Sequence, residues 1–200
     1  GRLGELRWVE MAWQGFGIWG RWRGQAAMGG GKIYDLGPHL VDQFLLLFPE
    51  AVESVYCRTH HDFPEADVES EGLLVLGFAG GRTAVVDVSS MALVQKPRFY
   101  LRGTAGTFVK HGLDPQEKAM MDGSIDAARE REDTYGQLRR KEGEEIVPTQ
   151  PGRWRTLYDN LRDVLTAGAT PLVTLDQARR VMQVIDAAKR SAATGQVIAL

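Results

Sequence analysis

The fold class is decided by residues 72–91, which read GLLVLGFAGGRTAVVDVSSM. Two apolar stretches, Gly72–Phe78 and Thr83–Met91, flank a short turn that contains two glycines. Valine and leucine runs around such a turn are typical of a β-hairpin. A second hairpin is expected from Arg98–Arg102 and Thr107–Lys110. Because strands joined by hairpins pair antiparallel, the sequence predicts an α+β fold and not a doubly wound parallel sheet.

Working outward from the hairpins, we expect a strand at Leu3–Trp13 and then a long loop at Gly15–Gly31, which holds seven glycines. Leu36, Leu40, Phe44 and Leu47 follow at helical spacing, and Pro49 ends that helix. Further strands are expected at Val52–Thr59 and Glu145–Val147.

Two closing helices are both expected to pack on the core. The first covers Arg153–Ala167 and ends at Gly168, and the second opens with a capping box at Thr174–Gln177. The apolar faces expected to point inward are Trp154, Leu157, Tyr158, Leu161 and Leu165 in the first helix, and Ala178, Val181, Met182, Ile185 and Ala188 in the second. Between these helices and the hairpins, Asp126–Glu145 has twelve charged residues in twenty and is expected to be a solvated excursion.

Composition excludes several classes of function. The 200 residues carry a formal net charge of −2, whereas a general nucleic-acid binder or an anionic-membrane binder carries a basic excess. The single cysteine, Cys57, excludes an internal disulfide and a cysteine-cluster zinc site, and fits a reducing, cytoplasmic compartment. No apolar run approaches the roughly 18 residues of a membrane span. The chain begins at Gly1 and not at methionine, so we expect a fragment.

One motif is misleading. Residues Gly15–Gly20 match the glycine spacing of a dinucleotide-binding fingerprint and follow an expected strand. That site also needs a helix starting at the third glycine and an acidic residue after a second strand. Here Arg21–Gly24 and then Gly29–Gly31 follow, which predicts a loop.

Asp35, His39 and Asp42 are spaced i, i+4 and i+7 along the early helix. A carboxylate one turn from an imidazole can orient the ring and raise its basicity, as in a general acid–base pair. Two alternatives remain open: Asp35 caps backbone near Pro38 while His39 is an ordinary polar residue, or the three groups bind a metal ion.

Four of the five tryptophans lie at positions 8, 13, 19 and 22, the last two beside Arg21 and Arg23. Flat aromatic faces and guanidinium donors suit a polyhydroxylated or anionic small molecule, and equally suit core packing. Trp22, Arg23 and Tyr158 are the candidate substrate-binding residues.

The stretch Gly29–Gln43, followed by Leu46–Pro49, resembles the C-terminal domain of the Gfo/Idh/MocA oxidoreductases, closest to the scyllo-inositol dehydrogenase branch. Residues 21–23, 103–110 and 112–117 fit the same branch. The resemblance implies an open-faced, mainly antiparallel sheet with helices on one face, which serves in oligomerisation. It also implies that Asp35 and His39 are the catalytic pair.

The resemblance further implies an N-terminal Rossmann domain that binds NAD or NADP and supplies a lysine from a Glu-Lys-Pro motif. Neither is in this chain, where the only Lys-Pro is Lys96-Pro97 after Gln95. We therefore expect residues 1–200 to be the substrate-binding and oligomerisation half of a cytoplasmic sugar or polyol dehydrogenase, inactive alone. The alternatives are a non-catalytic, self-associating interaction module and a metal-dependent isomerase.

Overall fold

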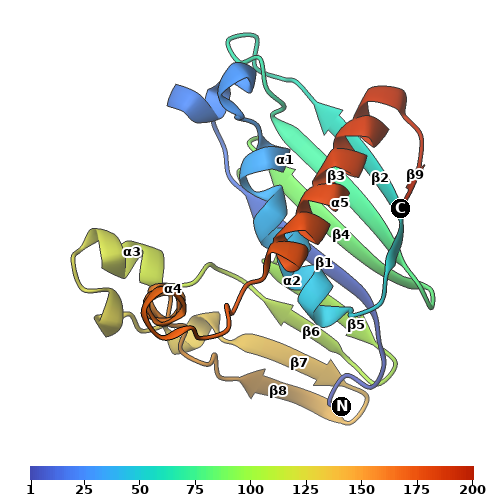
Figure 1. Cartoon of the computed structure of the whole chain (residues 1–200). Coiled ribbons are helices and arrows are strands. Elements are labelled where there is room, and N and C mark those ends of the chain that lie inside the picture. The colour runs from blue at the N-terminus through green and yellow to red at the C-terminus, as the bar shows by residue number, and fades with distance from the viewer.

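A single nine-stranded sheet runs through the protein in the strand order β8-β7-β6-β5-β1-β4-β3-β2-β9 (Figure 1). The computed structural model describes all residues from 1 to 200. The strands are β1 (Leu6–Gln14), β2 (Val52–His60), β3 (Glu71–Phe78), β4 (Arg82–Ser89), β5 (Phe99–Gly103), β6 (Thr107–Lys110), β7 (Gly136–Arg140), β8 (Gly143–Val147) and β9 (Ile198–Ala199). The helices are α1 (Lys32–Asp35), α2 (Gly37–Leu47), α3 (Gln116–Met121), α4 (Arg155–Ala167) and α5 (Leu175–Thr194), with short 3₁₀ turns at Arg21–Gly24, Ala26–Met28, Ile125–Ala127 and Glu132–Thr134.

The two predicted hairpins, β3–β4 and β5–β6, are confirmed and lie on opposite sides of β1. Strand β1 pairs antiparallel with β5 but parallel with β4, and this is the one parallel pair in the sheet. The parallel pair forms because the chain travels through α1, α2, β2 and β3 before it returns beside β1. The fold is α+β with a mainly antiparallel sheet, as predicted.

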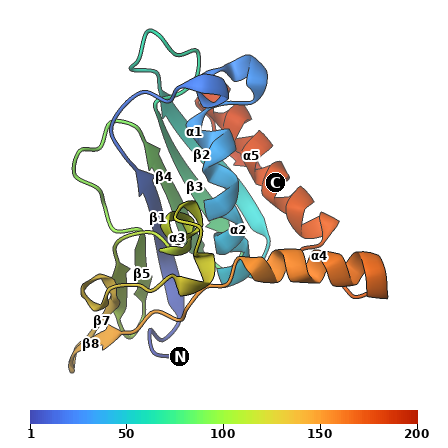
Figure 2. The same cartoon turned by 90° about the vertical axis from the view of Figure 1, so that its left-hand side faces the viewer.

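Helices α1, α2 and α5 cover one face of the sheet (Figures 1 and 2). Alternate residues of the central strands, such as Val9, Ala84 and Leu76, meet apolar side chains of these helices in one buried cluster. No helix covers the opposite face of β3 and β4, where Leu73 is 39% exposed. The sheet is therefore open-faced, with helices on one side.

Helix α5 begins with the predicted capping box between Thr174 and Gln177 and ends at Gly195. Its inward face was predicted only in part, since Ala178 and Met182 are exposed and Val184 and Ala187 are buried in their place. Its buried residues run from Val181 to Ser191, and the helix packs beside α2 and β2.

Helix α4 ends at the predicted residue and begins two residues later than predicted, but it does not have the predicted packing. It buries none of its residues, and Figure 2 shows it projecting beyond the sheet. Its apolar stripe faces outward, with Leu157 53%, Leu161 51% and Leu165 76% exposed. The expectation that α4 is a core helix is wrong, because the 3.6-residue period reports that one face is apolar but not what that face meets.

The prediction of a solvated excursion at Asp126–Glu145 is also wrong for its second half. Residues 136–147 form β7 and β8, which extend the sheet beyond β6, and Leu138 is buried. The charged side chains of these edge strands point to solvent and pair across the strands, as Arg139 does with Glu144. A high charge count is therefore compatible with an edge hairpin.

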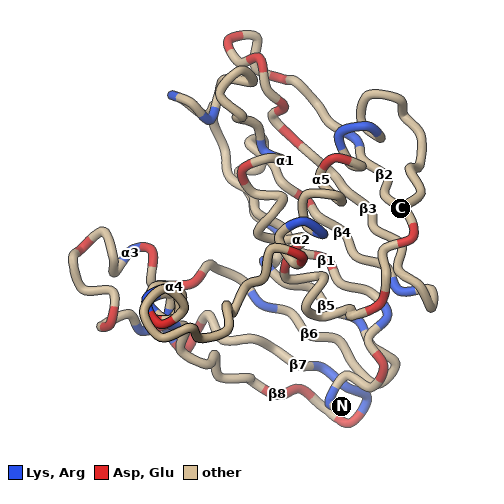
Figure 3. The backbone as a smooth tube through the Cα atoms, viewed as in Figure 1, with Lys and Arg blue, Asp and Glu red and all other residues tan.

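Acidic and basic residues intermingle along the whole chain (Figure 3). None of the helices is both long enough and apolar enough to cross a membrane.

Candidate functional site

The glycine-rich loop holds α1 against the sheet. A side chain at Gly30 would meet the carbonyl oxygens of Trp22 and Arg23 at 2.6 and 2.5 Å, so the loop folds tightly onto itself only because glycine is there. Gly31 has φ +112° and packs against the Glu69 carboxylate. That buried carboxylate accepts a hydrogen bond from the Ile33 backbone N–H at 2.8 Å and so holds the first turn of α1.

Three sequence-predicted site residues come together at this loop. Arg23 Nε donates to Asp35 Oδ2 at 2.9 Å, and the Arg23 guanidinium lies 4.7 Å from the centroid of the Trp22 ring. The Asp35 side chain is 17% exposed, whereas that of Arg23 is 50% exposed. The geometry fixes the Asp35 carboxylate by an ion pair at the end of α1.

Lys32 lies beneath this cluster and was not singled out by the sequence. It is buried, and its ammonium nitrogen lies 3.3 Å from the centroid of the Trp19 ring. Burial lowers the pKa of Lys32 to about 8, while the nearby Asp35 and Glu69 carboxylates act in the opposite direction. A cation with no ion pair of its own thus lies one turn before Asp35.

His39 lies on the next helix. Helix α1 ends at Asp35 and α2 begins at Gly37, with Pro38 in the first turn, where a missing N–H costs nothing. The His39 ring packs against Trp13 of β1, with ring centroids 5.6 Å apart. No hydrogen bond joins His39 to Asp35, so the predicted orienting contact between them is not formed in this structure.

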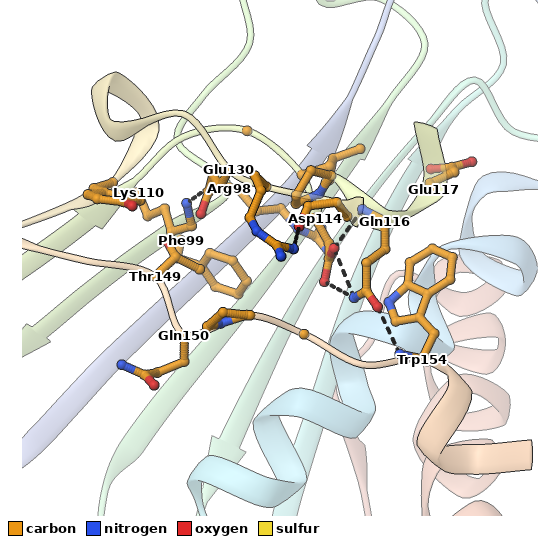
Figure 4. A pocket seen from close by; sticks show the side chains of 18 of the residues that line it. Arg98, Phe99, Lys110, Asp114, Gln116, Glu117, Glu130, Thr149, Gln150 and Trp154 are labelled. Atoms are coloured by element: carbon orange, nitrogen blue, oxygen red, sulfur yellow. Dashed lines mark hydrogen bonds and ion pairs between the residues drawn. The ribbon is translucent and has the colours of Figure 1, made fainter. Parts of the chain in front are cut away.

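His39 lines a cavity of about 620 Å³ between the early helices, β5 and the segments on either side of the charged region (Figure 4). The other polar side chains that line it are Gln43, Arg98, Lys110, Asp114, Gln116, Glu117, Arg129, Glu130, Tyr135, Thr149 and Gln150, and its aromatic walls are Trp13, Phe99 and Trp154. A cavity of this size with many polar groups fits a small polyhydroxylated ligand.

One wall of the cavity is a hydrogen-bonded clamp. The Gln116 side-chain amide donates to Asp114, and its oxygen accepts from the Trp154 backbone N–H at 2.9 Å (Figure 4). Gly152 packs so closely that a side chain there would meet Gln116 at 2.4 Å. The clamp joins the start of α3 to the segment that enters α4.

The opposite wall is an ion pair between Lys110 of β6 and Glu130, both largely buried. Lys110 also donates to the Thr134 carbonyl at 2.9 Å. Although burial raises the pKa of Glu130, its contacts with Lys110 and the Thr149 hydroxyl lower it more, so this carboxyl is ionised at neutral pH.

Two other predicted residues lie elsewhere. Tyr158 is 70% exposed on α4, and of the predicted site residues only His39 lines the cavity: Trp22, Arg23, Asp35, Asp42 and Tyr158 do not. The Gly15–Gly20 segment is a loop followed only by a four-residue 3₁₀ turn, as predicted, and so lacks the helix N-terminus that a pyrophosphate needs. No group of three or more His, Cys, Asp or Glu residues is arranged to hold a metal ion.

Sequence reasoning missed Arg98, Gln116 and Trp154 as cavity residues. Residues 112–117 were noted only as part of a family pattern, and nothing local marked Arg98. Their convergence depends on sheet pairing between segments far apart in the chain. Cys57 is buried, and burial raises the pKa of its thiol to about 12, which excludes thiolate chemistry at neutral pH.

The protein is an open-faced α+β domain with a cavity lined by aromatic and polar side chains. Comparison with known proteins identifies the family to which it belongs. Residues 1–109 match the family model of the GFO/IDH/MocA C-terminal domain, and the chain belongs to this family.

Curated relatives are oxidoreductases. The chain is 33% identical over 202 residues to the uncharacterized oxidoreductase YdgJ of Escherichia coli, covering 96% of this chain and 57% of that protein. It is 29% identical over 195 residues to the scyllo-inositol 2-dehydrogenase (NADP(+)) IolW of Bacillus subtilis, covering 90% and 52%. The chain thus spans about half the length of these relatives.

Solved structures share the fold over the whole chain. YvaA of Bacillus subtilis superposes with a TM-score of 0.89 at 25% identity, covering 100% of this chain and 58% of YvaA. An NAD-binding protein from Listeria innocua superposes with a TM-score of 0.79 at 26% identity, covering 98% and 56%.

Proposed function

We propose that this chain is the substrate-binding and catalytic half of an NAD(P)-dependent oxidoreductase that transfers hydride between a nicotinamide and a sugar or polyol hydroxyl. The observation that carries the proposal is His39 in the wall of a polar cavity, on the helix that resembles the family's catalytic segment. The names of IolW, an NADP(+)-dependent inositol dehydrogenase, and of the NAD-binding Listeria protein support the substrate class and the cofactor.

The dinucleotide itself does not fit this chain, because the glycine loop has no helix N-terminus for its phosphates. We assign its binding to an N-terminal domain of a longer protein, so that residues 1–200 form the substrate-binding and oligomerisation domain and are inactive alone. NAD or NADP would accept the hydride; the residues of this chain do the remaining work.

In this mechanism an imidazole nitrogen of His39 takes the proton of the substrate hydroxyl as its carbon is oxidised, and returns it in the reverse direction. Trp13 holds the ring from one side. Asp35, fixed by Arg23, places a carboxylate at the end of α1, just before the helix that carries His39. The polar groups of the cavity bind the remaining hydroxyls.

Replacing His39 by alanine in the enzyme that contains this chain should lower turnover roughly 10²-fold or more, because the general base is lost. Steady-state rates with NAD and with NADP measure the effect, and His60→Ala, an exposed histidine at the end of β2, is the matched control. Turnover of His39→Ala equal to that of the control would remove His39 from the mechanism.

A second candidate is a non-catalytic module that self-associates, and the uncovered sheet face with Leu73 exposed favours it. Both candidates include a homo-oligomer through this face, in a cytoplasmic protein that binds neither nucleic acid nor membrane. The two candidates differ in enzymatic turnover: the non-catalytic module would oxidise no polyol.

A further inference from the structure

Arg98 is a buried cation with no carboxylate partner. It is 8% exposed, and it is the only arginine of the chain that is both buried and outside every ion pair. One of its nitrogens donates to the Ala12 carbonyl at 3.1 Å. A guanidinium has five N–H groups, so most of its donors remain without an acceptor in the protein.

The surroundings of Arg98 hold the guanidinium without neutralising it. Its central carbon lies 4.4 Å from the centroid of the Trp13 ring and 5.5 Å from that of Phe99. Burial lowers the pKa of Arg98 to about 10, which still leaves it charged at neutral pH. Because a buried charge is costly unless it is paired, the arrangement is typical of a site whose counter-charge arrives with a ligand.

The cavity into which Arg98 opens is the one that His39 lines. Trp13 lies between the two, stacked on the guanidinium and against the imidazole. The other basic residue deep in this cavity, Lys110, is already paired with Glu130, and Asp114 is held by Gln116. Arg98 is therefore the buried cation of this cavity that has no carboxylate partner, and it shares Trp13 with the proposed general base.

Resting on the proposed function, we propose that the substrate is an anionic polyol, a sugar acid whose carboxylate binds Arg98 while a hydroxyl of the same molecule faces His39. The planar fork of a guanidinium matches a carboxylate in a bidentate, charge-assisted pair. The hydroxyls would contact the amide, carboxylate and hydroxyl groups of the cavity wall. A phosphorylated sugar is also anionic, with about −1.5 to −2 charge at neutral pH, and is separated from the sugar acid in the test.

The test compares matched acidic and neutral ligands on the full-length enzyme. Calorimetric binding and turnover would be measured for D-gluconate against D-glucitol, for D-glucuronate against D-glucose, and for D-glucose 6-phosphate. We expect each acid to bind about 10- to 100-fold more tightly than its neutral partner, the effect of one charge-assisted contact. Equal or tighter binding of the neutral partner overturns the inference, and tight binding of the phosphate alone would show that the site takes a phosphate and not a carboxylate.

Arg98→Gln should remove the preference, weakening the acid about 10- to 100-fold and the neutral sugar less than about 3-fold. Arg98→Lys should keep part of the preference even if Arg98→Gln folds poorly, since the charge remains. Arg58→Gln, an exposed arginine of β2 that lies outside the cavity, is the control. Equal weakening of acid and neutral ligand by Arg98→Gln would show a structural role and reject the site.

The two proposals fail separately. Sugar acids that bind through Arg98 but are oxidised with neither NAD nor NADP would leave the anion site intact and reject the proposed function. If neutral polyols turn over while sugar acids neither bind nor react, the proposed function stands and the anion site at Arg98 is rejected.

Discussion

Lys32 is buried, its ammonium group lies over the face of Trp19, and the Asp35 and Glu69 carboxylates are close enough to act on its charge. Stacking on an aromatic ring offsets part of the cost of desolvating an ammonium group, and the lowered pKa of about 8 reports the part that is not offset. Lys32 therefore lowers the stability of the native state at neutral pH, although it lies only one turn from Asp35. We infer that its charge is not there to stabilise the fold.

Replacing Lys32 by methionine should raise the free energy of unfolding at pH 7 by roughly 1–3 kcal/mol, because the desolvation cost is removed. In the wild type, the unfolded chain binds the Lys32 proton up to about pH 10.5 and the native state only to about pH 8. The free energy of unfolding of the wild type therefore rises with pH between about pH 8 and 10.5. The difference in stability between Lys32→Met and the wild type shrinks over the same range.

Denaturant unfolding of both proteins from pH 7 to 10.5 measures this. The difference curve is needed because Cys57, with its pKa raised to about 12, lowers the stability of both proteins above pH 9 by the same amount. A difference that does not change with pH would contradict the assignment.

At this scale the sequence predicted the residue types but not their contacts. The spacing of Asp35 and His39 indicated one continuous helix face, yet the break at Leu36 places them on successive helices, and Arg23 occupies the carboxylate. Arg98 could not be found from sequence, because its burial and its lack of a partner arise only when β5 pairs with β1.

Helix α1 packs closely on the sheet because residue 72 of β3 is a glycine and has no side chain. A side chain at Gly72 of β3 would lie 2.7 Å from Ile33 Cγ1 and 3.2 Å from Val88 Cγ2, both buried in the core. The same contact determines how deeply α1 sits, and therefore where Asp35 lies relative to Arg23.

Gly72→Ala should destabilise the fold by roughly 1–3 kcal/mol through overpacking, and should lower turnover in the enzyme by displacing α1. Gly15→Ala is the control, since nothing lies within 4 Å of a side chain there and its φ is ordinary. Thermal unfolding of both variants, and of Gly72→Ala combined with Ile33→Ala, gives the test. Strict additivity of the two core changes would show that Gly72 and Ile33 do not collide.

The sequence predicted the hairpins, the helix bounds and the caps well, because turn glycines and the Thr174 capping box are local signals. It failed where packing decides. The apolar stripe of α4 was assigned to the core although it faces outward, and the charged residues 136–144 were assigned to a solvated excursion although they belong to the β7–β8 hairpin at the edge of the sheet.

The uncovered face of the sheet presents a row of aligned side chains across five strands. Tyr56, Val75, Val85, Glu10 and Tyr100 are neighbours in register on this face. Apolar groups in the middle of the row, with charged ones around them, are what a protein–protein interface requires. We place the contact of the proposed homo-oligomer here.

Leu73→Lys should convert that oligomer to monomers in sedimentation velocity, because an ammonium group would be buried at the contact. In the monomer the substitution is tolerated, since Leu73 is 39% exposed and pairs with Asp87. Leu165→Lys on α4, at a residue 76% exposed, tests the rival apolar surface. Dissociation by Leu165→Lys and not by Leu73→Lys would move the interface to α4.

The position of β1 at the centre of the sheet has a consequence for synthesis. Its neighbours β4 and β5 begin at Arg82 and Phe99, so β1 leaves the ribosome well before either partner exists. At about 5–20 residues per second, Trp8, Val9, Met11 and Trp13 stay unpaired for roughly several seconds. Until β4 is made, β1 has no strand to pair with, and its apolar side chains are the part of the nascent chain that a chaperone would bind.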